Sequence, residues 1–260
     1  MIAQKTKTTP QKIGVFDSGA GGISVLKNLI ESNSFKEIIY YGDTARVPYG
    51  IKGKDTIKQY SLEALEFFAP FKLDLLIVAC NTASAYGLSA MQAVAPYPVI
   101  GVIEPGILAL ENTIQDKNAK ILILGTKATI SSNLYSKLLK DKGYLNTFGL
   151  ATSLFVPLVE EGIFEGAILD STIAHYFKHY PSIPDAIILG CTHFPLLAKS
   201  IANFYPNKPL LIHSGEAIMQ YLRNFYTLKN SNTKSKISFY ASDCVENLEK
   251  IANLWLSKNH

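Results

Sequence analysis

Residues 73–84 read LDLLIVACNTAS, and residues 184–195 read PDAIILGCTHFP. Both stretches hold an unbroken apolar run, a cysteine at its end and polar residues after the cysteine. Unbroken apolar runs of this length are typical of strands covered on both faces, as in the parallel sheets of α/β proteins. The two cysteines, Cys80 and Cys191, lie 111 positions apart. The pattern therefore predicts two copies of one unit, each with a cysteine at the carboxyl end of a buried strand.

Two further pairs of similar stretches are separated by nearly the same number of residues. The stretch KIGVFDSG at residues 12–19 matches KILILGTK at residues 120–127, which lies 108 positions later. Pro48 in the loop VPYG precedes Pro157 in the loop VPLVEEG by 109 positions. Three pairs at one spacing indicate two half-copies of a set of strand–helix units. Both cysteines would then lie where open α/β sheets bind their ligands, at the carboxyl ends of the strands.

Short apolar runs alternate with helical periodicity along the chain, which is typical of βαβ units. We therefore predict an α/β fold with two pseudo-symmetric domains, mainly parallel sheets and an active site in the cleft between the domains. The first domain comprises residues 1–102 plus 217–260, with residues 1–11 as a frayed tail, and the second comprises residues 103–216. Strands are expected at residues 12–16, 38–42, 73–79, 98–102, 120–125, 148–155, 185–190, 209–214 and 236–242.

The composition excludes several classes of protein. With 48% hydrophobic and 18% charged residues, the chain of 260 residues is not intrinsically disordered. The net charge is +4, but the lysines form no basic stripe, so we expect no nucleic-acid partner. No apolar run approaches the roughly 18 residues of a membrane span, and the N-terminus lacks the apolar core of a secretory signal. We expect a soluble, cytoplasmic protein with no membrane partner.

The cysteine count bears on the chemistry. Three cysteines at long spacings argue against a disulfide framework and against a cysteine-rich zinc site. Cys244 shares a helical spacing with Leu248, Ile251 and Trp255, so we expect it to be buried on the apolar face of a C-terminal helix. The other two cysteines remain as candidates for catalysis.

Cys80 and Cys191 each follow a strand and precede a helix N-terminus, where backbone N–H groups stabilise a thiolate. Two thiols on opposite sides of one cleft could remove a proton from one face of a carbon and return a proton to the other face, which inverts a stereocentre. Other uses of the pair fit less well. A disulfide oxidoreductase uses CxxC, and a cysteine hydrolase would leave one thiol idle. A metal site built from the two cysteines and His193 lacks a convincing fourth ligand.

The glycine-rich turn DSGAGG at residues 17–22 can hold an anion on its free N–H groups. It partly matches a dinucleotide fingerprint, since Asp43 ends the second strand about 20 residues later. However, Ser24 stands where the third glycine of that fingerprint would be, and Asp17 would sit badly against a pyrophosphate. We therefore favour a small substrate with a carboxylate and an ammonium group, with the carboxylate of Asp17 aimed into the cleft.

Five motifs together resemble those of the glutamate racemases, in the cofactor-independent aspartate/glutamate racemase family. They are FDSGAGG (16–22), ARVPYG (45–50), ACNTAS (79–84), VPLVEEG (156–162) and LGCTHFP (189–195). The resemblance runs from Lys12 nearly to the end of the chain, and its motifs favour the glutamate branch over the related aspartate racemases. It implies interconversion of L-glutamate and D-glutamate for peptidoglycan synthesis, without pyridoxal phosphate, metal or other cofactor. It also implies a homodimer.

The resemblance assigns roles residue by residue. Cys80 and Cys191 match the two catalytic cysteines, with Cys80 implied to deprotonate D-glutamate and Cys191 to deprotonate L-glutamate. Asp17 matches the acid that assists the first thiol, and Glu160 and His193 match the groups that assist the second. The matched substrate-binding positions are Asp17, Ser18, Tyr49, Gly50, Asn81, Thr82, Thr192 and His193.

Some alternatives stay open at this point. The spacing leaves open whether Glu160 or its neighbour Glu161 points inward. A dinucleotide-dependent oxidoreductase built on the turn at residues 17–22 is one alternative function, and it would bind a nicotinamide cofactor. A catalytically silent amino-acid-binding protein of the same fold is another, and it would bind glutamate without exchanging its α-proton.

Overall fold

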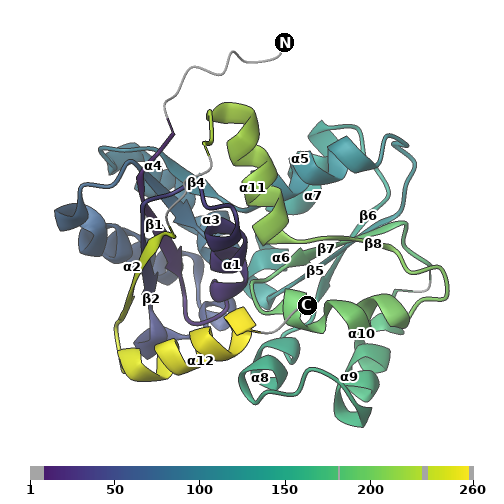
Figure 1. Ribbon diagram of the computed structural model, residues 1–260. Coiled ribbons are helices and arrows are strands. Elements are labelled where there is room, and N and C mark those ends of the chain that lie inside the picture. The colour runs from purple at the N-terminus through teal and green to yellow at the C-terminus, as the bar shows by residue number, and fades with distance from the viewer. Residues whose placement is uncertain (1–8, 181, 230–233, 258–260) are drawn as a thin grey trace.

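The computed structural model describes residues 9–180, 182–229 and 234–257, which form two halves around two sheets (Figure 1). The first sheet has the order β4 (Val99–Gly101), β3 (Leu75–Val78), β1 (Lys12–Asp17), β2 (Glu37–Gly42), β9 (Lys236–Ala241). The second has the order β6 (Thr147–Ala151), β5 (Ile121–Gly125), β7 (Ala186–Gly190), β8 (Leu210–Ile212). All strand pairs in these described ranges are parallel. The predicted α/β class is confirmed.

The two sheets share one topology, as the internal repeat predicts. In each half the first strand of the repeat pairs with the second on one side and with the third on the other, and the fourth lies beyond the third. β9 extends the first sheet by pairing with β2. β3 and β7 are buried along their whole length, which explains their unbroken apolar sequences. These are the strands that end just before Cys80 and Cys191.

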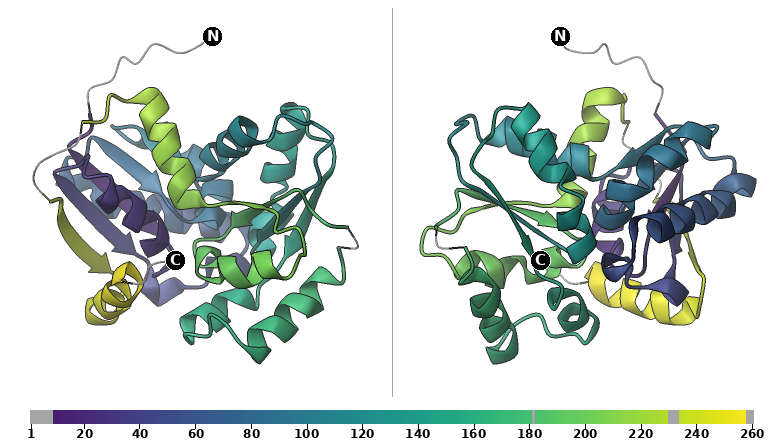
Figure 2. Two further views of the ribbon diagram at one scale, coloured as in Figure 1. Left: turned by 45° about the vertical axis from the view of Figure 1, so that its right-hand side comes forward. Right: turned by 180° about the vertical axis from the view of Figure 1, so that it is seen from behind.

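Helices cover both faces of the sheets (Figures 1 and 2). The longer ones are α1 (Ile23–Glu31), α2 (Lys54–Phe68), α5 (Ile103–Thr113), α7 (Leu134–Asp141), α9 (Ala167–Phe177), α11 (Ser214–Phe225) and α12 (Val245–Ser257). The shorter α-helices are α3 (Asn81–Tyr86), α4 (Leu88–Val94), α6 (Lys127–Ser131), α8 (Phe155–Glu160) and α10 (Ala198–Asn203). The part of the chain that the structure describes also contains the 3₁₀ helices η1 (Thr44–Arg46), η2 (Tyr49–Ile51), η3 (Ala69–Phe71) and η4 (Phe194–Leu197). α11 lies between the halves and packs against both α1 and α5.

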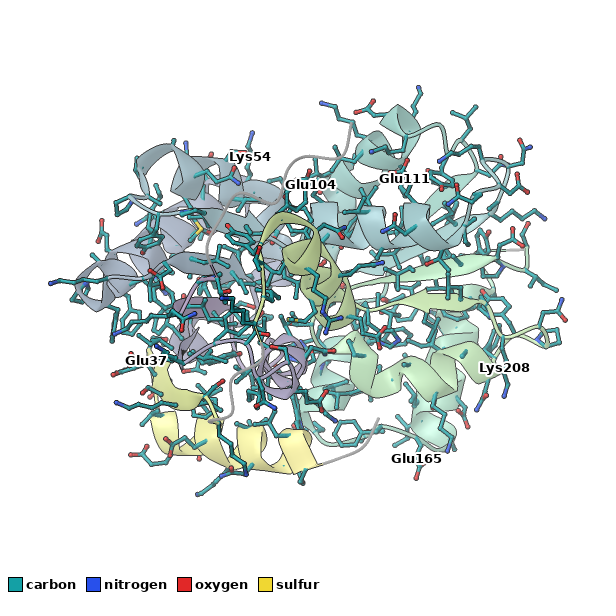
Figure 3. All side chains as sticks on the ribbon, turned by 45° about the horizontal axis from the view of Figure 1, so that its top comes forward. Glu37, Lys54, Glu104, Glu111, Glu165 and Lys208 are labelled. Atoms are coloured by element: carbon teal, nitrogen blue, oxygen red, sulfur yellow. The ribbon has the colours of Figure 1, made fainter. Side chains whose placement is uncertain are left out.

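Of the three clusters that buried apolar residues form in the described chain, the largest runs through both halves. It includes Val15 and Ile77 of the first sheet together with Leu122 and Leu189 of the second, and all four are fully buried. Charged side chains lie outside it. Figure 3 shows Lys54 and Lys208 on opposite sides of the molecule. Within the described residues, no helix is both long and apolar enough to cross a membrane.

Two details near the termini differ from the sequence-based expectations. Of the predicted tail, residues 1–8 lie outside the described residues, whereas Pro10 is buried and the Gln11 N–H donates to the carboxylate of Asp74 at 2.7 Å. The prediction of a buried Cys244 is wrong. Cys244 is exposed and adopts φ +45°, just before α12 begins. This left-handed turn takes its side chain off the helical face, so the buried stripe of α12 starts at Leu248.

The sixth strand is shorter than its apolar sequence suggests. We predict a strand over residues 148–155, but β6 ends at Ala151 and α8 begins at Phe155. The Phe155 N–H donates to the carbonyl of Thr152, which closes a turn. The apolar residues after the turn, Phe155 and Val156, are buried by the helix instead.

Candidate active site

The carboxyl ends of β1, β3 and β7 lead into one small cavity between the halves. The space open to the centre of a water molecule is about 20 Å³, which is about enough for a single water. Its lining residues are Ser18, Val47, Pro48, Tyr49, Gly50, Cys80, Asn81, Thr82, Thr126, Val156, Cys191, Thr192 and His193. Asp17 and Glu160 contact members of this set from behind. The structure therefore brings every predicted site residue to one place.

The lining is nearly symmetric under the internal repeat. Cys80 caps α3 after β3, and Asn81 and Thr82 are the first residues of that helix. Cys191, Thr192 and His193 follow β7 at the equivalent place in the second half. The two thiols thus come from equivalent positions in the two halves.

Sequence reasoning missed four lining residues. Thr126 stands 108 positions after Ser18, and Val156 stands 109 positions after Val47. These are the offsets of the repeat itself, so applying them to the quoted motifs would have pointed to Thr126 and Val156. The other two missed residues, Val47 and Pro48, directly precede the matched Tyr49 in the quoted motif ARVPYG, and that position in the motif could have pointed to them.

Cys80 is 5% exposed and caps helix α3. Its Sγ accepts the Ala83 N–H at 3.5 Å and donates to Ser18 Oγ at 3.4 Å. Burial raises the pKa of the Cys80 thiol to about 12, and the negative charge of Asp17 adds to the rise. Cys80 is therefore held as a neutral thiol, which can serve as a proton donor.

Asp17 is fully buried at the end of β1. Its Oδ2 accepts the Gly19 N–H at 3.0 Å, and its Oδ1 accepts the Thr192 hydroxyl at 3.3 Å. Burial raises the pKa of Asp17, while the positive charge of His193 and these hydrogen bonds oppose the rise. The Thr192 contact ties the acid of the first half to the cysteine loop of the second.

Cys191, His193 and Glu160 form a row in the second half. Cys191 Sγ lies 3.7 Å from His193 Nδ1, and His193 Nε2 lies 3.3 Å from Glu160 Oε1, without the alignment of a hydrogen bond. Burial alone lowers the pKa of His193, but Cys191 and Glu160 outweigh burial and bring the pKa to about 10. At neutral pH His193 is thus a cation, which stabilises negative charge on Cys191 Sγ. The sequence left open whether Glu160 or Glu161 points inward. In the structure it is Glu160, at the end of α8, that contacts His193.

The glycine-rich turn brings the halves close together. A Cβ added at Gly21 would lie 2.3 Å from Thr192 Oγ1 and 2.6 Å from His193 Nδ1. Only glycine lets these two side chains approach the turn so closely. They occupy the space beside the turn where a pyrophosphate would lie in a dinucleotide site, which argues against that alternative.

Tyr49 and Gly50 contribute to the lining in different ways. Tyr49 is buried, and its hydroxyl donates its proton to the carboxylate of Asp43, so this proton is not available to a ligand. A Cβ at Gly50 would lie 2.5 Å from Cβ of Thr126, so glycine allows the loop to close against the second half. Thr82, Thr126 and Thr129 place their hydroxyls 3.0 Å from one another.

The comparisons with known proteins agree with this geometry. Residues 13–222 match the family described as Asp/Glu/Hydantoin racemase. The chain belongs to this family. The glutamate racemase of Helicobacter pylori is 57% identical over 252 residues, which cover 94% of this chain and 99% of that protein.

Solved structures of family members are also similar to this chain. The crystal structure of the Campylobacter jejuni subsp. jejuni glutamate racemase is 55% identical and superposes with a TM-score of 0.93, covering 96% of this chain and 100% of that one. The glutamate racemase of Francisella tularensis subsp. tularensis, solved in complex with D-glutamate, is 30% identical with a TM-score of 0.81. The superposition covers 96% of this chain and 94% of the Francisella tularensis protein. Among the described residues, no group of three or more His, Cys, Asp or Glu side chains could hold a metal ion.

Proposed function

We propose that this member of the racemase family interconverts L-glutamate and D-glutamate by a two-base mechanism, with Cys80 and Cys191 on opposite faces of the substrate Cα. The observation that carries the proposal is the placement of two buried thiols, from equivalent turns of the two halves, in one cavity. The activity agrees with the close similarity to glutamate racemases over nearly the whole chain.

The chemistry requires a base, an acid and a stabilised carbanion. The α-proton of an amino acid is very weakly acidic, so the site must place the base closely and stabilise the developing charge. In the direction from L-glutamate, Cys191 takes the α-proton as a thiolate paired with the His193 cation, and Cys80 gives its proton to the opposite face. This turnover leaves Cys191 as the thiol and Cys80 as the thiolate, which is the state that deprotonates D-glutamate.

The neighbouring groups orient the thiols. Asp17 raises the pKa of Cys80 and thereby favours the thiol, so we assign it to proton relay or orientation rather than to stabilising a thiolate. Glu160 holds His193 beside Cys191. Ser18, Asn81, Thr82, Thr192 and the loop at Tyr49 and Gly50 surround the remaining space and bind the glutamate carboxylates and ammonium group.

The biological setting follows from the reaction. D-glutamate is a building block of peptidoglycan, and we propose that the enzyme supplies it in the cytoplasm. We further propose that the chain acts as a homodimer and needs neither pyridoxal phosphate nor metal. Light scattering of the purified protein measures the oligomeric state.

The decisive experiment is hydrogen exchange at Cα. Purified, reduced protein is incubated with L-glutamate in D₂O with a chelator and no added cofactor, and deuterium at Cα and optical rotation are followed together. We expect deuterium incorporation with loss of rotation. In Cys80→Ser and Cys191→Ser we expect racemisation to fall about 10²- to 10⁴-fold, because each variant lacks one proton-transfer group.

The outcomes separate the candidate functions. Glutamate binding without exchange from either enantiomer would identify a silent amino-acid-binding protein. Racemisation at nearly the parent rate in both serine variants would show that the thiols are not the two bases. Circular dichroism of the variants, compared with the parent, establishes that the fold is retained.

A further inference from the structure

Tyr135 is a buried residue that the proposed mechanism does not use. It belongs to α7 in the second half and is 3% exposed. Its hydroxyl donates to Oδ1 of Asn81, in the first half, at 2.6 Å. Over residues 9–180, 182–229 and 234–257, the hydroxyl has no other hydrogen-bond partner. The contact joins the two halves, and its acceptor Asn81 lines the cavity.

The amide of Asn81 is only half satisfied. Oδ1 accepts from Tyr135, whereas Nδ2 is buried and has no hydrogen-bond partner within the described part of the chain. Buried N–H groups without an acceptor are rare in folded proteins and call for an explanation. Asn81 lines the cavity between the two thiols. A ligand in that cavity with an acceptor oxygen would satisfy Nδ2.

The phenol is fixed as a donor at this position. Burial raises the pKa of Tyr135, and the negative charge of Cys191 adds to the rise, so the hydroxyl stays protonated. The ring lies against the backbone before Cys191, since a Cβ added at Gly190 would lie 3.3 Å from Cε2 of Tyr135. The ring is therefore held in place, and its hydroxyl reaches Asn81 from a constant direction.

We propose that Tyr135 is a positioning residue whose hydroxyl fixes the Asn81 amide so that Nδ2, and not Oδ1, faces a carboxylate oxygen of glutamate. The inference rests on the proposed function, because it names a group that orients the substrate of that reaction. An amide that is free to turn about its Cβ–Cγ bond would also present Oδ1, which repels a carboxylate. The hydrogen bond from the phenol holds the Asn81 amide in one orientation before the substrate binds.

Tyr135→Phe tests the proposal because it removes the hydroxyl and keeps the ring. We expect the KM for both enantiomers to rise about five- to tenfold, because the variant lacks one hydrogen bond. The value of kcat should change less than about twofold. Tyr144→Phe is the matched control. Tyr144 is buried in the same cluster, but its hydroxyl donates to the carbonyl of Ile114, away from the cavity. Its KM should stay at the parent value, and the two variants should lose similar thermal stability.

A double-mutant cycle shows whether Tyr135 acts through Asn81. In an Asn81→Ala background, Tyr135→Phe should change the KM no further. An equal rise in both backgrounds, or no rise in the single variant of an active enzyme, would overturn the proposal.

Two further measurements cover the remaining cases. If Tyr135→Phe does not fold, Asn81→Asp keeps an acceptor for the phenol but puts an oxygen in place of Nδ2. Its KM should rise at least tenfold, and an unchanged KM would contradict the proposal. If the parent protein does not racemise glutamate, the proposed function fails, and calorimetric Kd values for glutamate replace KM in the same comparisons.

Discussion

At the scale of single residues, the two thiols lie in opposite electrostatic surroundings. Cys80 lies beside the carboxylate of Asp17, and its pKa is raised to about 12. Cys191 lies beside His193, whose pKa is raised to about 10. One thiol is thus kept protonated while the other faces a cation. We propose that this asymmetry supplies one acid and one base from two chemically identical side chains.

The charge on His193 predicts a pH dependence of stability. Because the pKa of His193 is higher in the folded state than its ordinary 6.5, its contribution is fully present below pH 6.5 and is lost as the pH rises through about 10. We expect the free-energy difference between the parent and His193→Gln to shrink by roughly 2–5 kcal/mol over that range. Urea denaturation followed by circular dichroism at pH 6.5, 8 and 9.5 measures it.

His213 provides the control for this experiment. Burial lowers the pKa of His213, so its contribution is present above pH 6.5 and is lost only as the pH falls. The difference between the parent and His213→Gln should therefore stay constant from pH 6.5 to 9.5. A His193→Gln difference that is equally constant would show that His193 is neutral in the folded protein.

The sequence predicted which residues lie at the site, but it did not predict the directions in which their side chains point. Spacing and motif placed Cys80 and Cys191 at strand ends, and the structure has both thiols in one cavity. The orientation of the Tyr49 hydroxyl toward Asp43 depends on a buried carboxylate that no local pattern indicates. The contact between Tyr135 and Asn81 joins residues 54 positions apart, which only the packed halves bring together.

At the scale of elements, the turn between β1 and α1 sets how closely the halves approach. Gly21→Ala would place Cβ 2.3 Å from Thr192 Oγ1, so Thr192 and His193 must move. We expect kcat/KM to fall by about 10²-fold or more, because displacements of about 1 Å in a catalytic site have that effect. Stability should fall by about 1–3 kcal/mol from overpacking.

Gly53→Ala is the matched control for the turn. A Cβ at Gly53 meets no atom within 4 Å, so its kcat/KM should equal that of the parent. Steady-state kinetics in both directions and urea denaturation compare the two variants. Full activity in Gly21→Ala would mean that the turn and the cysteine loop need not touch during catalysis.

Elements that bury both faces were predicted better than those that end in turns. β3 and β7 have unbroken apolar sequences because helices cover both of their faces, and their positions agree with prediction within two residues. β6 stops early because a turn closed by backbone hydrogen bonding starts α8 inside the same apolar run. Apolar periodicity does not distinguish a buried strand end from the first turn of a buried helix.

At the scale of the whole molecule, the halves share a core and are joined by α11. That helix packs on α1 of the first half and α5 of the second. The boundary that we propose between residues 216 and 217 falls in the first turn of this helix. The cavity between the halves that holds the two thiols admits about one water molecule, far less than a glutamate. Substrate entry thus requires the halves or their loops to move apart.

This requirement predicts unequal reactivity of the three cysteines. Cys244 is exposed, whereas Cys80 and Cys191 are 5% and 6% exposed. Iodoacetamide should modify Cys244 first and the two site thiols more slowly, since they become accessible only through opening. Saturating glutamate should slow the reaction of the two site thiols at least about tenfold, because bound glutamate occupies the space in front of both sulfur atoms. The rate at Cys244 should stay unchanged. Peptide mass spectrometry over time gives each rate, and three equal rates would show that the cavity is open in solution.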